Sequence, residues 1–252
     1  PGYWYNNHST KRDKQMKLLD TGTSNTKIRK TQKSVADVRV ASLSLMPDTT
    51  ICPSCEIAGC INLCLKESGR GRFDNVAQAR QSKSDYFHAN RDDFLSQLRK
   101  ELTNFVKVCK RDNLKPVARL NVLSDIQYER HGIPQSFPEI TFYDYTKLAK
   151  RIGNTPDNYS LIFSYSKAPA YQKQVDLALQ TDAPIAVVFD KIPTDPSYRF
   201  LGRRVIDGDK SDLVNVKAGP VIIGLKYKRT KATDAMGNES DFVINTNLIA
   251  RA

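Results

Sequence analysis

Four of the five cysteines in this chain lie within thirteen positions, in the segment ICPSCEIAGCINLCLKESGRGRF at residues 51–73. They are Cys52, Cys55, Cys60 and Cys64. A single free cysteine usually packs in a core as a small apolar residue. These four alternate with Glu56, Gly59 and Asn62, which do not suit a hydrophobic core. Because thiolates are the ligands of zinc and of iron–sulfur clusters, the segment predicts a metal-binding loop.

The spacing of the four cysteines bears on which metal binds. Structural zinc sites usually combine two Cys-x-x-Cys pairs across a longer insertion, or add histidines. Here Cys-x2-Cys-x4-Cys-x3-Cys lies in a single loop, and the three histidines of the chain are His8, His88 and His131. Short gaps that let one loop surround a cluster are nearer to iron–sulfur ligation. We therefore expect an iron–sulfur cluster of the 4Fe-4S type, with zinc and oxidised cysteine pairs as alternatives.

Polar side chains follow several apolar runs of the sequence. In a parallel α/β sheet the carboxyl ends of the strands form one shared face, and sites assemble there. The cysteine loop directly follows the first such run, so it should open onto the same face. The candidate catalytic residues are Asp125, Asp144, Lys147 and Asp190. The candidate cofactor-binding residues are Asn121, Ser124, Ser164 and Ser166. The alternative is that each of them only caps a turn.

Basic residues are concentrated at the start of the chain. The net charge is +12 and the isoelectric point is about 9.5. Residues 1–40 contain nine Lys/Arg against three Asp/Glu, and we interpret residues 1–34 as a basic, extended or loosely ordered arm. Such an arm is either a solvated terminus or a contact for nucleic acid with little sequence preference. The candidate anion-binding residues are Lys27, Arg29 and Lys30 of the arm, and Arg70 and Arg72 after the cysteines.

Short apolar segments alternate with helical patterns and must position these residues. Expected strands cover 38–46, 118–126, 139–147, 159–167, 183–191 and 219–228, and expected helices cover 74–89, 91–110, 144–152 and 169–181. Asn90 is the expected cap of the helix at 91–110, and Cys109 belongs to its apolar stripe as a core thiol. The alternation predicts an α/β domain over 35–252 with a mainly parallel sheet, curved into a partial or closed barrel of about six to eight strands.

The apolar runs are too short for the chain to cross a membrane. None approaches the roughly 20 residues that a spanning helix needs, and the polar, aromatic amino terminus has no apolar region typical of a secretory signal. We therefore expect a cytoplasmic protein with no membrane partner. In that compartment clustered thiols favour metal binding over disulfides.

Several motifs resemble those of a family of phage and mobile-element proteins akin to mycobacteriophage gene product 88. They are CPSCEIAGCINLCLKESGRGRFDNVAQAR, ARLNVLSDIQYE, ITFYDYTKLAKR, NYSLIFSYS, AVVFD, RVIDGDKSDL and VIIGLKYK, in this order over roughly residues 36–245. The resemblance implies a phage-encoded protein in the bacterial host's cytoplasm, with a barrel-like fold similar to a radical SAM domain. It also implies a recurring set of three cysteines, which map to Cys52, Cys60 and Cys64, with Cys55 as an extra thiol.

The cysteine spacing departs from the radical SAM signature, Cys-x3-Cys-x2-Cys. Cys60-x3-Cys64 is followed three residues later by Glu67 rather than by a cysteine. If Cys55 stays free, one iron is open to S-adenosylmethionine; if all four cysteines bind, the cluster is closed. Two functions remain: a radical-SAM-like iron–sulfur enzyme acting on a nucleotide or nucleic acid, and a non-catalytic, metal-stabilised nucleic-acid-binding phage protein.

Overall fold

The computed structural model describes residues 16–21, 26–64, 71, 73–209, 211–228 and 240–246. The helices are α1 (Thr26–Ser34), α2 (Asp74–Ala89), α3 (Arg91–Arg111), α4 (Gln172–Leu179) and α5 (Asp212–Asn215). The strands are β1 (Val38–Ser42), β2 (Lys115–Arg119), β3 (Thr141–Thr146), β4 (Tyr159–Ser164), β5 (Ile185–Phe189), β6 (Arg199–Phe200), β7 (Arg203–Asp207), β8 (Ile222–Lys226) and β9 (Val243–Ile244). Among these elements, no helix is both long and apolar enough to cross a membrane.

The strands form one mostly parallel sheet of nine strands. Its order is β1-β2-β3-β4-β5-β8-β7-β6, and β9 pairs with β5 beside that path. Every pairing is parallel except that of β6 with β7. The expected parallel α/β sheet is therefore confirmed. In the described part of the chain the sheet is open, with β1 and β6 at its two ends, so a closed barrel is not observed.

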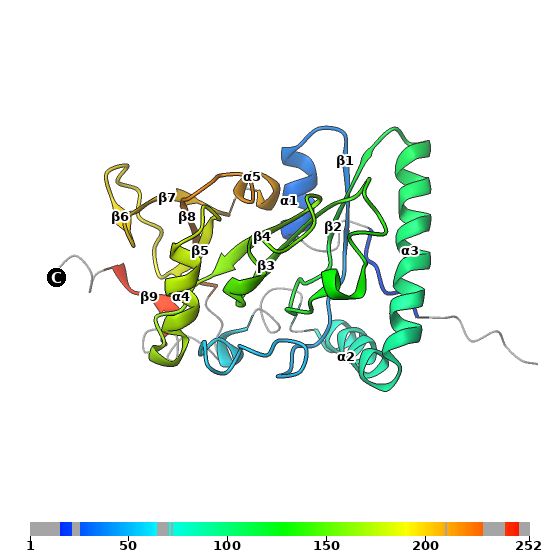
Figure 1. Ribbon diagram of the computed structural model, residues 1–252, viewed down its shortest axis with the longest axis horizontal. Helices are drawn as coiled ribbons and strands as arrows, with labels where there is room; N and C mark the ends of the chain where they lie inside the picture. Colours follow the sequence, from blue (N-terminus) through cyan, green and yellow to red (C-terminus); the bar gives the residue numbers. More distant parts are fainter. Residues whose placement is uncertain are drawn as a thin grey trace, which may run out of the picture.

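The sheet is buried on both faces, which is why its strands read as apolar runs. On one face, Phe142 of β3 and Phe163 of β4 belong to clusters completed by α3 and α4. On the other face, Tyr143 and Ile162, which are the sequence neighbours of Phe142 and Phe163, pack with α1 and α5. Figure 1 shows α3 beside β1 and β2 at one end of the sheet, and α4 near β5 and β8 toward the other.

The expected helix at 91–110 is confirmed as α3. Asn90 caps it, because its side chain accepts a hydrogen bond from the amide of Asp93. Asp92 and Asp93 lie in the first turn and Lys110 and Arg111 in the last, as the helix dipole favours. Cys109 is fully buried in the core cluster that α3 completes, where it packs as an apolar residue.

Two expected elements differ from the structure. The strand expected at 118–126 is β2 at Lys115–Arg119, and the residues that follow form a loop. Asn121 explains the early end, because its side-chain oxygen accepts the amide hydrogen of Ile126 and so folds the chain back. The helix expected at 144–152 is replaced by the end of β3 and a 3-10 turn, η5 (Ala149–Arg151). Strands β6, β7 and β9 were not predicted.

Part of the expected basic arm is packed on the domain. Leu18, Leu19 and Ile28 are buried, and α1 contributes to the core on one face of the sheet. This differs from an extended or loosely ordered arm over 1–34, because a few apolar side chains suffice to attach a segment. Residues 1–15 and 22–25 lie outside the described residues.

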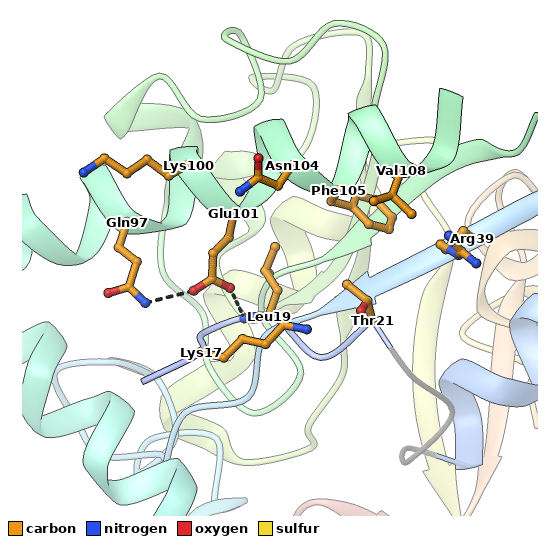
Figure 2. Close-up of a pocket in the computed structure, with 10 residues that line it drawn as sticks. All are labelled: Lys17, Leu19, Thr21, Arg39, Gln97, Lys100, Glu101, Asn104, Phe105 and Val108. Carbon is orange, nitrogen blue, oxygen red and sulfur yellow. Dashed lines mark hydrogen bonds between the residues drawn. The ribbon is translucent and has the colours of Figure 1, made fainter. Parts of the chain in front are cut away.

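Polar side chains of α2 and α3 hold the main chain of residues 16–19. The Glu101 carboxylate accepts the amide hydrogens of Leu18 and Leu19, at 2.9 and 2.8 Å. Gln97 donates to the carbonyl of Met16, and Lys83 donates to that of Leu18. Figure 2 shows Glu101 reaching from α3 toward Leu19 across a cavity of about 620 Å³. Residues 16–19 are thus attached through main-chain hydrogen bonds as well as through the buried side chains of Leu18 and Leu19. A sequence pattern does not reveal such main-chain contacts.

We predict that Glu101→Ala destabilises the protein by about 1–3 kcal/mol, because two backbone amides lose a charged acceptor. Urea unfolding measures this change, and faster tryptic cleavage after Lys17 reports the release of the segment. The matched control is Lys107→Ala, an exposed position on the same helix. Equal unfolding and cleavage in the two variants would show that Glu101 does not hold the segment.

Candidate functional site

Backbone hydrogen bonds fold the cysteine loop, residues 51–64, into compact turns. Asp48 begins it: the side chain accepts the amides of Thr50 and Ile51, and the carbonyl accepts that of Cys52. Gly59 has a φ of 63°, a left-handed conformation that glycine adopts without strain. The loop ends in a 3-10 turn, η1 (Ile61–Leu63). In Figure 1 it runs below the strands, between α2 and α4.

Asp125 joins the cysteine loop to the ends of two strands. Its amide donates to the carbonyl of Ile51 at 2.9 Å. Its carboxylate accepts hydrogen bonds from the amide and hydroxyl at the end of β3, Lys147 N at 2.8 Å and Thr146 Oγ1 at 3.2 Å. The same carboxylate forms a buried ion pair with Arg151. The loop is therefore fixed over the carboxyl ends of β2 and β3.

A cavity of about 220 Å³ lies between the cysteine loop and the strand ends. All four loop cysteines line it: Cys52, Cys55, Cys60 and Cys64. Five of the candidate polar residues line it as well: Asn121, Ser124, Asp125, Lys147 and Ser164. Asp125 and Cys60 thus share one end of the sheet, as the sequence predicted, and the strands β2 and β3 on this side of the cavity are neighbours.

The cysteine thiols are close to one another but are not arranged as a ligand set. All five cysteines of the chain are free thiols. Burial raises the pKa of the Cys52 thiol; Asp125 and Cys60 act in the same direction, and Lys147 opposes them. The Cys60 thiol donates to the Cys55 carbonyl at 3.5 Å. Among the described residues, no three His, Cys, Asp or Glu side chains are grouped to hold a metal ion.

The four candidate catalytic residues occupy different environments. Asp125 and Lys147 line the cavity. Asp144 does not: its carboxylate, fully buried, accepts hydrogen bonds from the amide of Asn121 and the hydroxyl of Tyr159. Asp190 also lies away from the cavity lining, and its carboxylate accepts the amide and hydroxyl of Thr246. These two carboxylates hold the backbone in place.

The candidate cofactor-binding residues divide in the same way. Asn121, Ser124 and Ser164 line the cavity, and Ser124 donates to the Asn121 side chain at 2.8 Å. Ser164 accepts a hydrogen bond from Lys147 Nζ at 2.9 Å. Ser166 is buried outside the cavity lining, where it donates to the carbonyl of Asp241. Only the first three are therefore placed to contact a ligand.

The expected anion-binding residues lie mostly beyond what the structure describes. Arg70, Arg72 and the side chain of Lys27 fall outside the described residues. Arg29 and Lys30 are exposed on α1. A nucleic-acid partner stays a prediction.

Arg119 is a cavity residue that the sequence did not single out. It closes β2, and its Nη1 donates to the Asp212 carboxylate of α5 at 2.9 Å. Its guanidinium lies 4.8 Å from the ring centre of Tyr145. Its Nε is buried and has no hydrogen-bond partner among the described residues, although the Asp144 carboxylate lies 4.0 Å away. The expected strand at 118–126 placed Arg119 near the start of a strand. In the structure it is the last residue of β2, at the end of the strand that borders the cavity.

Comparison with protein families places these features in a known group. A family model described as gene product 88 matches residues 15–245, a span that includes every helix and strand of the structure. Comparisons with curated proteins and with solved structures gave no match. The expected phage gene product family is therefore confirmed, whereas likeness to radical SAM enzymes gains no support from these comparisons.

We predict that Arg151→Ala lowers the free energy of unfolding by about 3–5 kcal/mol, because it leaves two buried carboxylates without a cation. Arg151 pairs with Glu129 at 2.8 Å as well as with Asp125, and all three side chains are largely buried. Urea unfolding measures the loss, and Lys150→Ala, at an exposed neighbouring position, is the matched control. A loss no larger than that of the control would contradict the role given to the ion pair.

The buried carboxyl group of Asp144 leads to a separate prediction about how the stability of the protein depends on pH. Burial raises its pKa to about 6 from an ordinary value of 3.8. Between these values the folded state keeps a proton that the unfolded state has released, so the free energy of unfolding falls as pH rises from about 4 to 6. We expect Asp144→Asn to remove about 1–3 kcal/mol of that fall. Urea titrations at both pH values test this, with Asp157→Asn, an exposed position, as the control; an unchanged fall would exclude Asp144 as its source.

Proposed function

We propose that this chain, which belongs to the gene product 88 family, binds a metal centre through the cysteine loop at the carboxyl ends of its parallel strands. One observation carries the proposal: all four loop cysteines line a single cavity together with polar strand-end residues. Cys52, Cys60 and Cys64 are the proposed ligands. Cys55 is a fourth ligand or a neighbour.

The donor chemistry of the loop fits a thiolate-ligated centre. Soft thiolates select zinc or iron–sulfur clusters over hard cations such as Mg²⁺. Cys55 and Cys60 are buried in the core cluster that α4 completes, which differs from the expectation that the loop cysteines lie outside a core. Cys52 and Cys64 are only partly buried. The described conformation does not group three ligands, so binding requires the loop to draw its thiols together. Compact turns without long helices make such an adjustment local.

The surrounding residues would determine how such a centre behaves. When bound, an iron–sulfur cluster supplies electron transfer, whereas zinc supplies a structural cross-link of the loop. Lys147 favours the thiolate form of Cys52 by its charge. Apolar side chains such as Leu63 and Phe242 line the cavity and limit the access of water. S-adenosylmethionine remains a prediction for an iron–sulfur centre in which Cys55 is not a ligand.

We predict that Cys60→Ser removes most of the bound metal from protein purified without oxygen and lowers its thermal stability. Metal binding is coupled to folding, so losing one thiolate weakens both. Metal analysis of matched preparations measures the effect. The control is Cys109→Ala, which removes a core thiol away from the cavity and should leave the metal content unchanged.

The same preparations distinguish the two metals. A brown protein with a broad visible absorption band favours an iron–sulfur enzyme, and a colourless protein containing zinc favours the metal-stabilised, non-catalytic alternative. Unchanged metal content in Cys60→Ser would contradict the proposed ligand set. Wild-type protein without metal, prepared anaerobically with both metals supplied, would contradict the metal centre itself.

A further inference from the structure

Lys147 is a buried cation in the cavity beside the cysteine loop. It lies just after β3, and its exposure is 7%. Its Nζ donates to Ser164 Oγ at 2.9 Å and lies 4.5 Å from the ring centre of Phe242. No ion pair joins Nζ to a carboxylate in the described part of the chain. The adjacent carboxylate, Asp125, is paired with Arg151 instead.

A buried ammonium group without a counter-charge is costly. Removing a charge from water costs several kcal/mol unless an opposite charge and hydrogen bonds replace the water. Ser164 and the Phe242 ring replace part of that solvation, but neither carries a negative charge. The arrangement is therefore more stable with an anion in the cavity, next to Nζ.

The rest of the cavity also favours an anion. Its charged side chains are four basic ones, Arg119, Lys147, Lys226 and Lys228, and two acidic ones, Asp125 and Asp209. Asp125 is paired with Arg151, and Arg119 is paired with Asp212. Apart from these two pairs, the cavity lining holds three lysines and one carboxylate, Asp209, which accepts the amide hydrogen of Lys226 at 3.2 Å. The basic excess lies at the end of the sheet where ligands of parallel α/β proteins bind.

We propose that the cavity binds a small molecule with an oxyanion group, a carboxylate or a phosphate, whose charge is held by Lys147. Ser164 lies on the same cavity lining, accepts a hydrogen bond from Lys147 and offers its own hydroxyl hydrogen to the ligand. Apolar walls that include Leu123 and Val188 hold the remainder of the ligand. At about 220 Å³ the cavity is smaller than the roughly 300–1,000 Å³ typical of drug-sized ligands, which favours a compact molecule over a polymer. This ligand site rests on the proposed function in that it adjoins the proposed metal centre.

The experiment titrates two probes, inorganic phosphate and benzoate, into anaerobically purified protein by calorimetry. Chloride keeps the ionic strength constant. The two probes distinguish a phosphate site from a carboxylate site with an apolar body. We expect one probe to bind saturably to the wild type and about ten-fold or more weakly to Lys147→Gln, because a hydrogen bond to a charged group is lost. Lys150→Gln, an exposed lysine three positions away, is the matched control and should bind like the wild type.

A second variant and a measurement of metal content separate the possible outcomes. Ser164→Ala removes the hydroxyl beside Nζ, and weaker binding by this variant supports the site if Lys147→Gln does not fold. Metal content is measured on the same samples and in Cys60→Ser. Wild-type protein that binds a probe but holds no metal would contradict only the metal centre, and metal-loaded protein that binds neither probe would contradict only the oxyanion site. Binding of neither probe, or equal binding by wild type and Lys147→Gln, would overturn the oxyanion site and leave Lys147 as a partner of the thiolates alone.

Discussion

The buried ion pair between Asp125 and Arg151 is the interaction on which the rest of the site depends. The amide of Asp125 holds the cysteine loop at Ile51, and its carboxylate holds the end of β3 at Lys147. A carboxylate can accept several backbone and side-chain donors at once, but when buried it needs a cation. Arg151, in turn fixed by Glu129, provides that charge. The same buried ion pair therefore holds the cysteine loop and the strand ends that enclose the cavity.

Much of the architecture could be predicted because burial on both faces gives strands an unambiguous apolar signature. The six expected strands and the capped helix α3 are found near their expected positions. The structure differs from the predicted elements where a side chain forms hydrogen bonds with the main chain. Asn121 ends β2 early, and Glu101 fixes residues 18 and 19 through their amides. The first contact is local and the second joins residues 82 positions apart, but in both cases a side chain takes over main-chain hydrogen bonds that the apolar pattern does not report. Short strands such as β9 carry too few residues to form a pattern.

The candidate site was predictable in its topology and less so in its individual residues. A loop that follows the first strand must open at the carboxyl ends of parallel strands, and this brought the cysteines beside Asn121 and Lys147. Asp144 is excluded because it lies before the end of β3, whereas the last two residues of the strand, Tyr145 and Thr146, line the cavity from opposite faces. Arg119 was expected near the start of a strand and lies at the end of β2 instead, so only the structure shows that it lines the cavity.

The central claim is that thiolates of the cysteine loop bind a metal at this end of the sheet. X-ray absorption spectroscopy of anaerobically purified protein tests it most directly, because it reports the atoms bonded to the metal. The account predicts an iron or zinc edge with a sulfur shell at about 2.3 Å, the length of a zinc–thiolate bond, and three or four sulfur neighbours per metal. A metal surrounded only by oxygen and nitrogen, or no bound metal at all, would contradict it.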